Sequence, residues 1–220
     1  VGTLIVGRIK GVSRPCLATV VPSPARPVIM CDVGANADCK PEYLVQFAQM
    51  GSVYAQKVIG CEHPRVALLN IGEEDTKGSK FALEAHQLLR ENVPGFTGNC
   101  EGRDVLAATY DVVVTDGFTG NVCLKTIEGA SKVLFGAVKD AMMTSLKTKI
   151  GALCLKDSLY ELKAKVSPDT YGGAPLLGVK GACLTGHGSS NATAIKNGVL
   201  TSAKVVRQGV SEIIEQMVTK

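Results

Sequence analysis

The feature that most constrains the fold is a short β-branched run followed at once by a glycine-bearing turn and a long helical pattern. Residues 112–114 are all valine, and the turn TDGFTGN follows at residues 115–121. A short apolar run closed by polar turn residues is typical of a strand buried on both faces. Apolar residues then recur near helical spacing from Asn121 past Met142, with Thr119 or Asn121 as the candidate N-cap. We therefore expect a central strand that leads directly into a helix.

This turn is a candidate anion site. The unpaired N–H groups and the dipole at a helix N-terminus favour negative charge, and Gly117 and Gly120 leave room for a ligand near the backbone. Asp116 adds a carboxylate at the same point. The alternative is an ordinary strand-to-helix turn with no ligand, because glycine turns are frequent in α/β folds. The turn alone leaves both interpretations open.

Two further strand–turn–helix units precede the central one. The first is a strand over residues 28–33 with a helix over 41–57, and the second is a strand over 66–71 with a helix over 79–91. Strands that alternate with helices of this length predict an α/β fold with a mostly parallel sheet and helices on both faces. We expect residues 1–220 to form a single α/β domain.

The remaining segments are predicted from their turn residues. We expect residues 1–27 to hold a helix end and a proline-dotted connection, and residues 96–104 to form a short link. Residues 171–178 read as an ordered loop, residues 179–184 as a strand, and a final helix runs from about 191 to 218.

The helical pattern of the central unit is unusually long. A second amphipathic stretch covers residues 142–166, with lysines between the apolar positions and a helix break expected at Gly151. We expect residues 120–167 to form a projecting pair of long helices. Their apolar stripe fits packing against another helix, in a dimer or an intramolecular bundle, and it also fits a membrane surface.

Composition and cysteine spacing narrow the functional classes. The net charge of +4 is mild and the lysines are spread out, so no nucleic-acid partner is expected. The eight cysteines include no C-x-x-C pair and there are no paired histidines at ligand spacing, so we expect no metal site. We interpret the cysteines as reduced, buried residues of a cytosolic protein. The sequence shows no signal peptide or membrane-spanning stretch, and it starts at Val1 within an apparent helix, which is consistent with a fragment of a longer chain.

Polar loops should meet at the carboxyl edge of the predicted sheet, where open parallel sheets bind ligands. Four loops fit that position: residues 32–38, 70–78, 116–121 and 187–191. His187 lies between glycines at a helix start, where an imidazole suits proton transfer near neutral pH. The alternative is that His187 only caps the helix or bonds a nearby carbonyl.

Three basic residues are candidates for binding an anionic substrate. Lys77 lies close to a helix N-terminus, which disfavours a cation and so suggests a bound anion, although an ion pair with Glu73, Glu74 or Asp75 is the simpler explanation. Arg103 and Lys125 are either phosphate contacts or members of surface pairs. The sequence has no G-x-S-x-G, no Walker motif and no cysteine nucleophile in a polar turn, so a covalent enzyme intermediate is not expected.

The sequence resembles the PlsX-type phosphate acyltransferases of bacterial phospholipid synthesis. The segments that carry the resemblance occur in the family's order and cover nearly the whole chain: LLNIGEE at 68–74 with KG at 77–78, FTGNCEGRD at 96–104, residues 111–129, YGGA at 171–174 and HGSS at 187–190. The family's N-terminal Asp-Ala-Met-Gly-Gly-Asp and Gly-Asn-Thr-Gly motifs do not occur here. The family's cleft draws on that segment, so the resemblance implies that the isolated chain is inactive.

The resemblance implies an enzyme that moves a fatty acyl group from acyl carrier protein to inorganic phosphate without a cofactor. It also implies a fold related to phosphotransacetylases and isopropylmalate dehydrogenases, a homodimer, and a cytoplasmic enzyme that associates transiently with the membrane through residues 142–166. The alternatives are a short-chain phosphotransacetylase that uses coenzyme A and a non-catalytic dimerising scaffold.

We expect phosphate to attack the thioester directly, held by the 116–121 turn and Lys77. His187 would supply a proton, Asp116 would orient the reacting groups, and Asn70, Asn99 or Asn121 would stabilise the oxyanion. The complete set of predicted catalytic and substrate-binding residues is His187, Lys77, Asp116, Asn121, Asn70, Gly72, Asn99, Arg103, Gly117, Gly120, Gly188 and Ser189.

Overall fold

The computed structural model describes residues 2–23, 25–165, 170–188 and 190–218 and contains one mixed sheet of seven strands. Their order across the sheet is β4 (Phe96–Cys100), β3 (Val66–Leu69), β5 (Val112–Val114), β2 (Val28–Cys31), β1 (Cys16–Val21), β6 (Ala174–Leu177) and β7 (Leu184–Thr185). The first four strands are parallel, and every later pairing is antiparallel. The predicted α/β class is confirmed, and β5 lies in the middle of the parallel part.

Helices cover both faces of the sheet, as predicted. Val112 and Val114 of β5 belong to the core beneath α1 (Pro41–Tyr54), α2 (Lys80–Asn92) and α8 (Val210–Val218). Val113 points to the other face and packs with residues of α3 (Gly102–Ala107) and α4 (Gly117–Met142). All three valines are fully buried, because alternate strand positions face opposite helical layers.

Capping side chains fix where the helices next to the site begin. Ser79 Oγ accepts the Ala82 N–H at 3.2 Å and starts α2, and Asp116 Oδ1 accepts the Thr119 N–H at 2.8 Å and starts α4. The predicted N-cap of α4 was therefore wrong, since the helix begins at Gly117 with Asp116 as its cap. Asn121 lies inside the helix.

The missed strands all lie in glycine- or proline-bearing segments. The segment predicted as a connection holds β1, preceded by the π-helix η1 (Gly2–Val6), the predicted link holds β4 and α3, and the predicted loop 171–178 holds β6. Their pairing with neighbouring strands decides these structures, and short sequence patterns do not carry that information. The strand predicted over 179–184 is reduced to β7, and the last helix is divided into α7 (Ala192–Arg207) and α8 at Gly209, whose φ of +61° ends α7.

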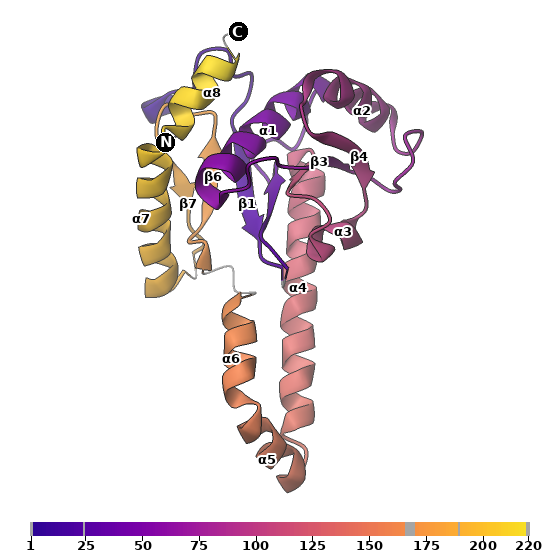
Figure 1. The fold of residues 1–220 in the computed structure, drawn as a ribbon, viewed down its shortest axis with the longest axis vertical. Coiled ribbons are helices and arrows are strands. Elements are labelled where there is room, and N and C mark those ends of the chain that lie inside the picture. The colour runs from indigo at the N-terminus through magenta and orange to yellow at the C-terminus, as the bar shows by residue number, and fades with distance from the viewer. Residues whose placement is uncertain (1, 24, 166–169, 189, 219–220) are drawn as a thin grey trace.

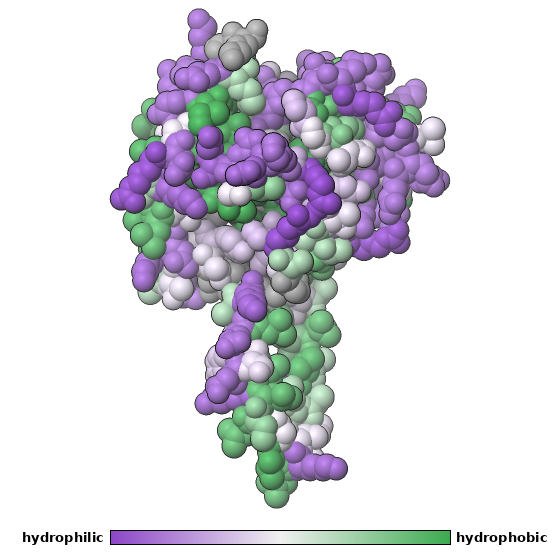
Figure 2. Space-filling model, in the orientation of Figure 1, coloured by the Kyte–Doolittle hydropathy of each residue, from purple (hydrophilic) through white to green (hydrophobic). Residues whose placement is uncertain are grey.

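The helical arm, residues 128–165, extends away from the sheet (Figure 1). It comprises the end of α4, then α5 (Leu146–Cys154), then α6 (Lys156–Lys165), so the chain breaks after Met142 and at Leu155, and Gly151 lies inside α5. Residues 166 and 167 of the predicted pair lie outside the described residues. Figure 2 shows apolar surface along this arm, and its exposed residues include Val133, Leu134, Met143, Leu146, Ile150 and Leu153. No helix in the described part of the chain is both long and apolar enough to span a membrane.

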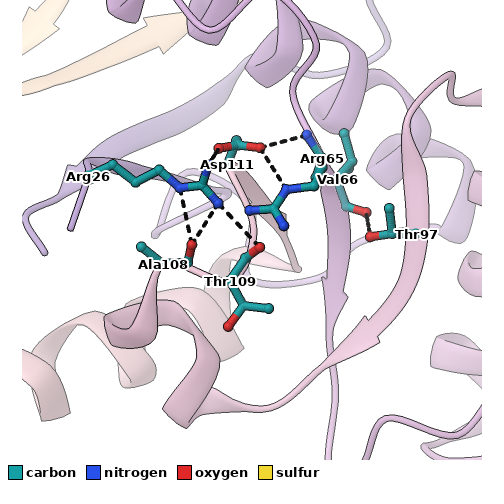
Figure 3. A network of polar contacts seen from close by, with 7 residues as sticks. All are labelled: Arg26, Arg65, Val66, Thr97, Ala108, Thr109 and Asp111. Carbon is teal, nitrogen blue, oxygen red and sulfur yellow. Dashed lines mark hydrogen bonds and ion pairs between the residues drawn. The ribbon is translucent and has the colours of Figure 1, made fainter.

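A polar network closes the opposite, amino edge of the parallel strands (Figure 3). The buried Asp111 carboxylate, just before β5, lies 3.0 Å from Arg26 Nη1, accepts the Arg65 backbone N–H at 2.8 Å and lies 3.3 Å from Arg65 Nε. Arg26 also donates to the Ala108 carbonyl at the end of α3. The starts of β3 and β5 are thereby tied to the segment before β2.

Candidate functional site

A cavity of about 410 Å³ opens at the carboxyl edge of β3 and β5. Its walls are largely apolar and come from α1, β3 and α2: Leu44, Leu68, Leu69, Phe81 and Ala82. Its polar lining comes from the ends of β3 and β5 and the starts of α2 and α4: Asn70, Ser79, Thr115, Asp116 and Thr119. An apolar cavity with a few convergent polar groups is the usual form of a small-molecule site.

The 70–78 loop forms one side of this cavity and is closed by Asn70. The Asn70 side chain accepts the Ile71 N–H at 2.9 Å and donates to the Lys77 carbonyl at 3.0 Å. Gly78 has a φ of +106°, and a Cβ there would lie 2.6 Å from Asn70 Oδ1. The loop therefore needs glycine at position 78 to bring Lys77 back to the start of α2.

Asp32 organises the other side, a role that we missed in the sequence. Its fully buried carboxylate accepts N–H groups from Leu17 at 2.9 Å, from Ala35 at 3.2 Å, and from the backbone and side chain of Asn36 at 2.7 and 2.9 Å. The Asn36 carbonyl in turn accepts the Gly117 N–H at 2.8 Å. The only signal in the sequence was an acidic residue directly after a buried apolar run.

The two helix starts at the cavity differ in their free donors. In α4 the N–H groups of Gly117, Thr119 and Gly120 bond to the Asn36 carbonyl and to the Asp116 side chain and carbonyl. Of the first four amides only that of Phe118 has no acceptor within the described ranges, so the predicted cradle of free amides at residues 116–121 is corrected to a single amide. In α2 Ser79 satisfies Ala82, and the amides of Lys80 and Phe81 have no acceptor among the described residues. The start of α2 therefore offers an anion more free backbone N–H donors than the start of α4 does.

The candidate cations lie in different settings. Lys77 is exposed and its ammonium has no ion-pair partner within the described ranges, whereas Asp75 is bound by Arg90 and Glu73 by Arg103. Arg103, exposed in the first turn of α3, lies 3.4 Å from Glu73 and 2.8 Å from Glu101. Lys125 pairs with Glu128 at 2.7 Å, which favours the surface-pair alternative.

The other predicted residues of this edge have structural contacts. Asn99 is buried, and its amide bonds to His86 at 2.8 Å and to the Glu74 carbonyl at 2.8 Å, so it is already engaged within the protein. A Cβ at Gly72 would lie 2.9 Å from a Glu74 carboxylate oxygen. Asn121 is exposed beside Gly34 of the 32–38 loop.

His187 does not join this edge of the sheet. Since β1, β6 and β7 are each antiparallel to the strand before them in the sheet, β7 runs opposite to β2, and the chain leaves Thr185 toward the amino edge. β7 is also four strands from β5, or about 19 Å at a usual strand spacing of about 4.8 Å. His187 and Gly188 are exposed there, and Ser189 lies outside the described residues. The expected meeting of four loops is thus corrected to three.

The cysteines supply no activated nucleophile at the cavity. All eight are free, and Cys16, Cys31 and Cys100 are buried, but Cys154 on the arm is exposed, contrary to the expectation of burial. Cys39 lies close to Asp116, and burial, assisted by the charges of Asp32 and Asp116, raises the pKa of its thiol to about 11. Within the described residues, no cluster of three or more His, Cys, Asp or Glu side chains is arranged to hold a metal.

This arrangement places the chain in a known fold class. A phosphotransacetylase from Streptococcus pyogenes aligns with a TM-score of 0.56 at 14% identity, covering 94% of this chain and 58% of that protein. A phosphotransacetylase from Staphylococcus aureus aligns with a TM-score of 0.52 at 15% identity, covering 91% and 56%. At such identities the likeness establishes the fold alone.

The sequence defines the family. The family described as "Fatty acid synthesis protein" matches residues 1–213, and the chain belongs to it. Proteins named "Phosphate acyltransferase" are 44% identical in Clostridioides difficile over all of this chain, 46% in Brevibacillus brevis over all of it, and 48% in Thermus thermophilus over 97% of it. The resemblance inferred from the motifs is confirmed. The chain spans 65% to 66% of the length of these relatives.

We expect Gly120→Ala to damage the junction between α4 and the 32–38 loop. A Cβ at Gly120 would overlap the Asp32 carbonyl oxygen, whereas a Cβ at Gly129, in the same helix, meets nothing within 4 Å. Overpacking of this kind should lower the free energy of unfolding by about 3 kcal/mol. Gly129→Ala should raise it by up to about 1 kcal/mol through helix propensity. Urea unfolding measures both, and equal midpoints for the two variants would contradict the close packing at Gly120.

The Cys39 thiol should stay protonated at pH 8, because this pH lies below its raised pKa of about 11. Only about one thousandth of it would then be the reactive thiolate. Alkylation with iodoacetamide, followed by peptide mass spectrometry, should modify the exposed Cys154 first and accelerate at Cys39 as the pH rises toward 11. Equal rates at the two cysteines at pH 8 would show that Cys39 is activated.

Proposed function

We propose that this protein transfers a fatty acyl group from the thioester of acyl carrier protein to inorganic phosphate, giving an acyl phosphate for phospholipid synthesis. The observation that carries the proposal is the largely apolar cavity beside the start of α2, where the amides of Lys80 and Phe81 have no acceptor in the described part of the chain. Lys77, whose ammonium has no ion-pair partner there, precedes the lining residues Gly78 and Ser79 in the chain. Membership of the fatty acid synthesis family and the names of the relatives support it.

Phosphate would bind at the mouth of the cavity, at the start of α2. The amides of Lys80 and Phe81 would donate to its oxygens, Lys77 would add a positive charge, and Asn70 would keep the 70–78 loop closed around it. Asp116, on the α4 side, would accept a hydrogen bond from the hydroxyl group of monohydrogen phosphate and so orient one oxygen for attack. Arg103, exposed at the start of α3, would attract the anion.

The reaction would proceed without a covalent enzyme intermediate. A phosphate oxygen attacks the thioester carbon, the C–S bond breaks, and the thiolate leaves and takes a proton from water at the open mouth. Fixing both substrates in line can supply about 7–11 kcal/mol of the barrier, which makes a protein nucleophile unnecessary. His187 is no longer assigned to this cavity, and a catalytic role for it would require a second copy of the chain or another segment.

A short-chain phosphotransacetylase that uses coenzyme A is the second candidate, favoured by the fold likeness. A scaffold without activity is the third. Full-length protein incubated with palmitoyl-acyl carrier protein and labelled phosphate separates them. Labelled acyl phosphate supports the proposal, product from acetyl-coenzyme A alone supports the second candidate, and a folded protein with no product supports the third.

Lys77→Ala should raise the KM for phosphate by about ten- to hundredfold, the range expected when a charge-assisted hydrogen bond to an anion is lost. The KM for the acyl donor should change little. Lys57→Ala is the matched control, because Lys57 is also exposed but lies in η2 (Ala55–Ile59), outside the lining of the cavity. Steady-state kinetics with phosphate varied measures the effect, and unchanged phosphate kinetics would remove Lys77 from the site.

The proposal extends to a cytoplasmic homodimer that touches the membrane surface transiently through residues 142–166. The arm supports this, because Leu146 and Leu153 are 77% and 70% exposed and lysines such as Lys147 and Lys149 lie between the apolar positions. Apolar residues flanked by lysines suit an anionic lipid surface. The exposed apolar side of α4 in the arm, which includes Val133 and Leu134, would face the second copy.

Replacing Leu146, Ile150 and Leu153 together by serine should weaken sedimentation with anionic vesicles at least about tenfold, because each buried side chain contributes about 1.5–3 kcal/mol. The control replaces Leu4 and Ile5 by serine, since these are 92% and 78% exposed but lie off the arm. Light scattering reports whether either variant remains a dimer. Undiminished vesicle binding by the arm variant would contradict membrane contact at this position.

A further inference from the structure

The cavity at the carboxyl edge runs from an exposed mouth to a buried floor. Ile71 and Ser79 line it and are exposed, whereas its buried lining residues are Leu44, Leu68 and Thr115. Leu44 and Leu68 are 0% and 2% exposed and belong to the core beneath α1, α2 and α8. The groups that would hold phosphate lie at the start of α2, so the interior beyond them has no ligand in the proposed reaction as described above.

Size and polarity limit what can enter this interior. The cavity measures about 410 Å³, whereas an apolar cavity of about 150 Å³ is enough for benzene, so there is room for a chain segment more than twice that size. A folded carrier protein cannot enter, and only the acyl end of its thioester can reach the floor. The buried lining residues that the structure describes include no ionisable side chain, and Phe81 and Ala82 continue the apolar wall.

Ala82 is the smallest side chain of this apolar wall. It is half-buried in the first turn of α2, and its backbone N–H is already held by Ser79. A Cβ at Gly78 would lie 2.7 Å from the Ala82 Cβ, so the backbone of the 70–78 loop lies directly against this methyl group. A larger side chain at position 82 has no room on the loop side and must extend into the cavity.

We propose that the acyl chain of the thioester enters this cavity with its methyl end toward Leu44, and that Leu44 and Ala82 determine the chain length that the site accepts. The carbonyl carbon then stays at the mouth, beside the phosphate at the start of α2. Each methylene that enters the apolar interior raises the affinity about fourfold, until the chain reaches Leu44. The link to catalysis rests on the proposed function, whereas the binding of a free fatty acid does not.

Displacement of fluorescent cis-parinaric acid from the full-length protein tests the cavity directly, with saturated fatty acids from octanoate to stearate as competitors. The affinity of the wild type should rise about fourfold per methylene and then level off. Ala82→Phe fills part of the cavity, so its affinity should level off at a shorter chain. It should bind palmitate at least about tenfold more weakly than the wild type, the loss expected when two methylenes are kept out.

Leu83→Phe is the matched control, because Leu83 is the next residue of α2, is 40% exposed and does not line the cavity. It should match the wild type. An Ala82→Phe series that coincides with the wild type would overturn the inference. If Ala82→Phe does not fold, leucine methyl shifts of the wild type titrated with palmitate decide. Shifts at Leu44 and Leu68 support the inference, and shifts confined to the leucines of the arm would overturn it.

The consequence for catalysis is measured as kcat/KM for palmitoyl-acyl carrier protein divided by that for octanoyl-acyl carrier protein. Ala82→Phe should lower this ratio at least about tenfold, with the KM for phosphate little changed, because the octanoyl chain has fewer methylenes to lose from the cavity. An unchanged ratio would contradict the role of Ala82. An absence of acyl phosphate from the wild type would refute the proposed function, and the fatty acid series would still decide whether the cavity holds the chain.

Discussion

The carboxyl edge of the sheet depends on a buried carboxylate, that of Asp32, which has no cationic partner among the residues that the structure describes. Asp32 is stabilised there because four N–H groups point at its two oxygens, which replaces the hydration that burial removes. Those donors come from β1 and from the loop after β2, and Asn36 passes the constraint to the first amide of α4. The tie therefore sets where α4 begins, and with it the positions of Asp116 and Thr119 at the cavity.

This constraint gives the two helix starts at the cavity different properties. Three of the first four amides of α4 bond to Asn36 and to Asp116, and the Asp116 carboxylate places a negative charge on that side. At the start of α2 the amides of Lys80 and Phe81 have no acceptor in the part of the chain that the structure describes, and Lys77 precedes the helix. N–H donors and a lysine at the start of α2 suit an anion, and the Asp116 carboxylate at the start of α4 can accept a hydrogen bond from it. This combination suits a phosphate nucleophile. Asp111 and its arginines secure the opposite edge, so the cavity and this polar network lie at opposite ends of the strands.

Much of this architecture could be predicted from local patterns. The run of valines in β5 and the turn after it predicted a buried strand and a helix. The order of the motifs along the chain identified the family. The antiparallel strands could not be predicted, because β1 and β6 are short, lie among prolines and glycines and depend on pairing with distant segments. His187 was placed at the wrong edge of the sheet for the same reason, because its position follows from the direction of β7. The hydrogen-bonding roles of Asp32 and Asn99 could not be predicted either, because their partners are distant in the sequence and meet only in the folded protein.

The central claim is that the carboxyl edge between β3 and β5 holds the oxyanion at the start of α2. The most direct measurement is a titration of the ¹⁵N-labelled full-length protein with inorganic phosphate, followed by amide chemical shifts. The account predicts saturable shifts at Gly78, Lys80 and Phe81, with Gly186 and Gly188 unaffected. Shifts centred on Gly186 and Gly188, with the amides of α2 unchanged, would contradict it.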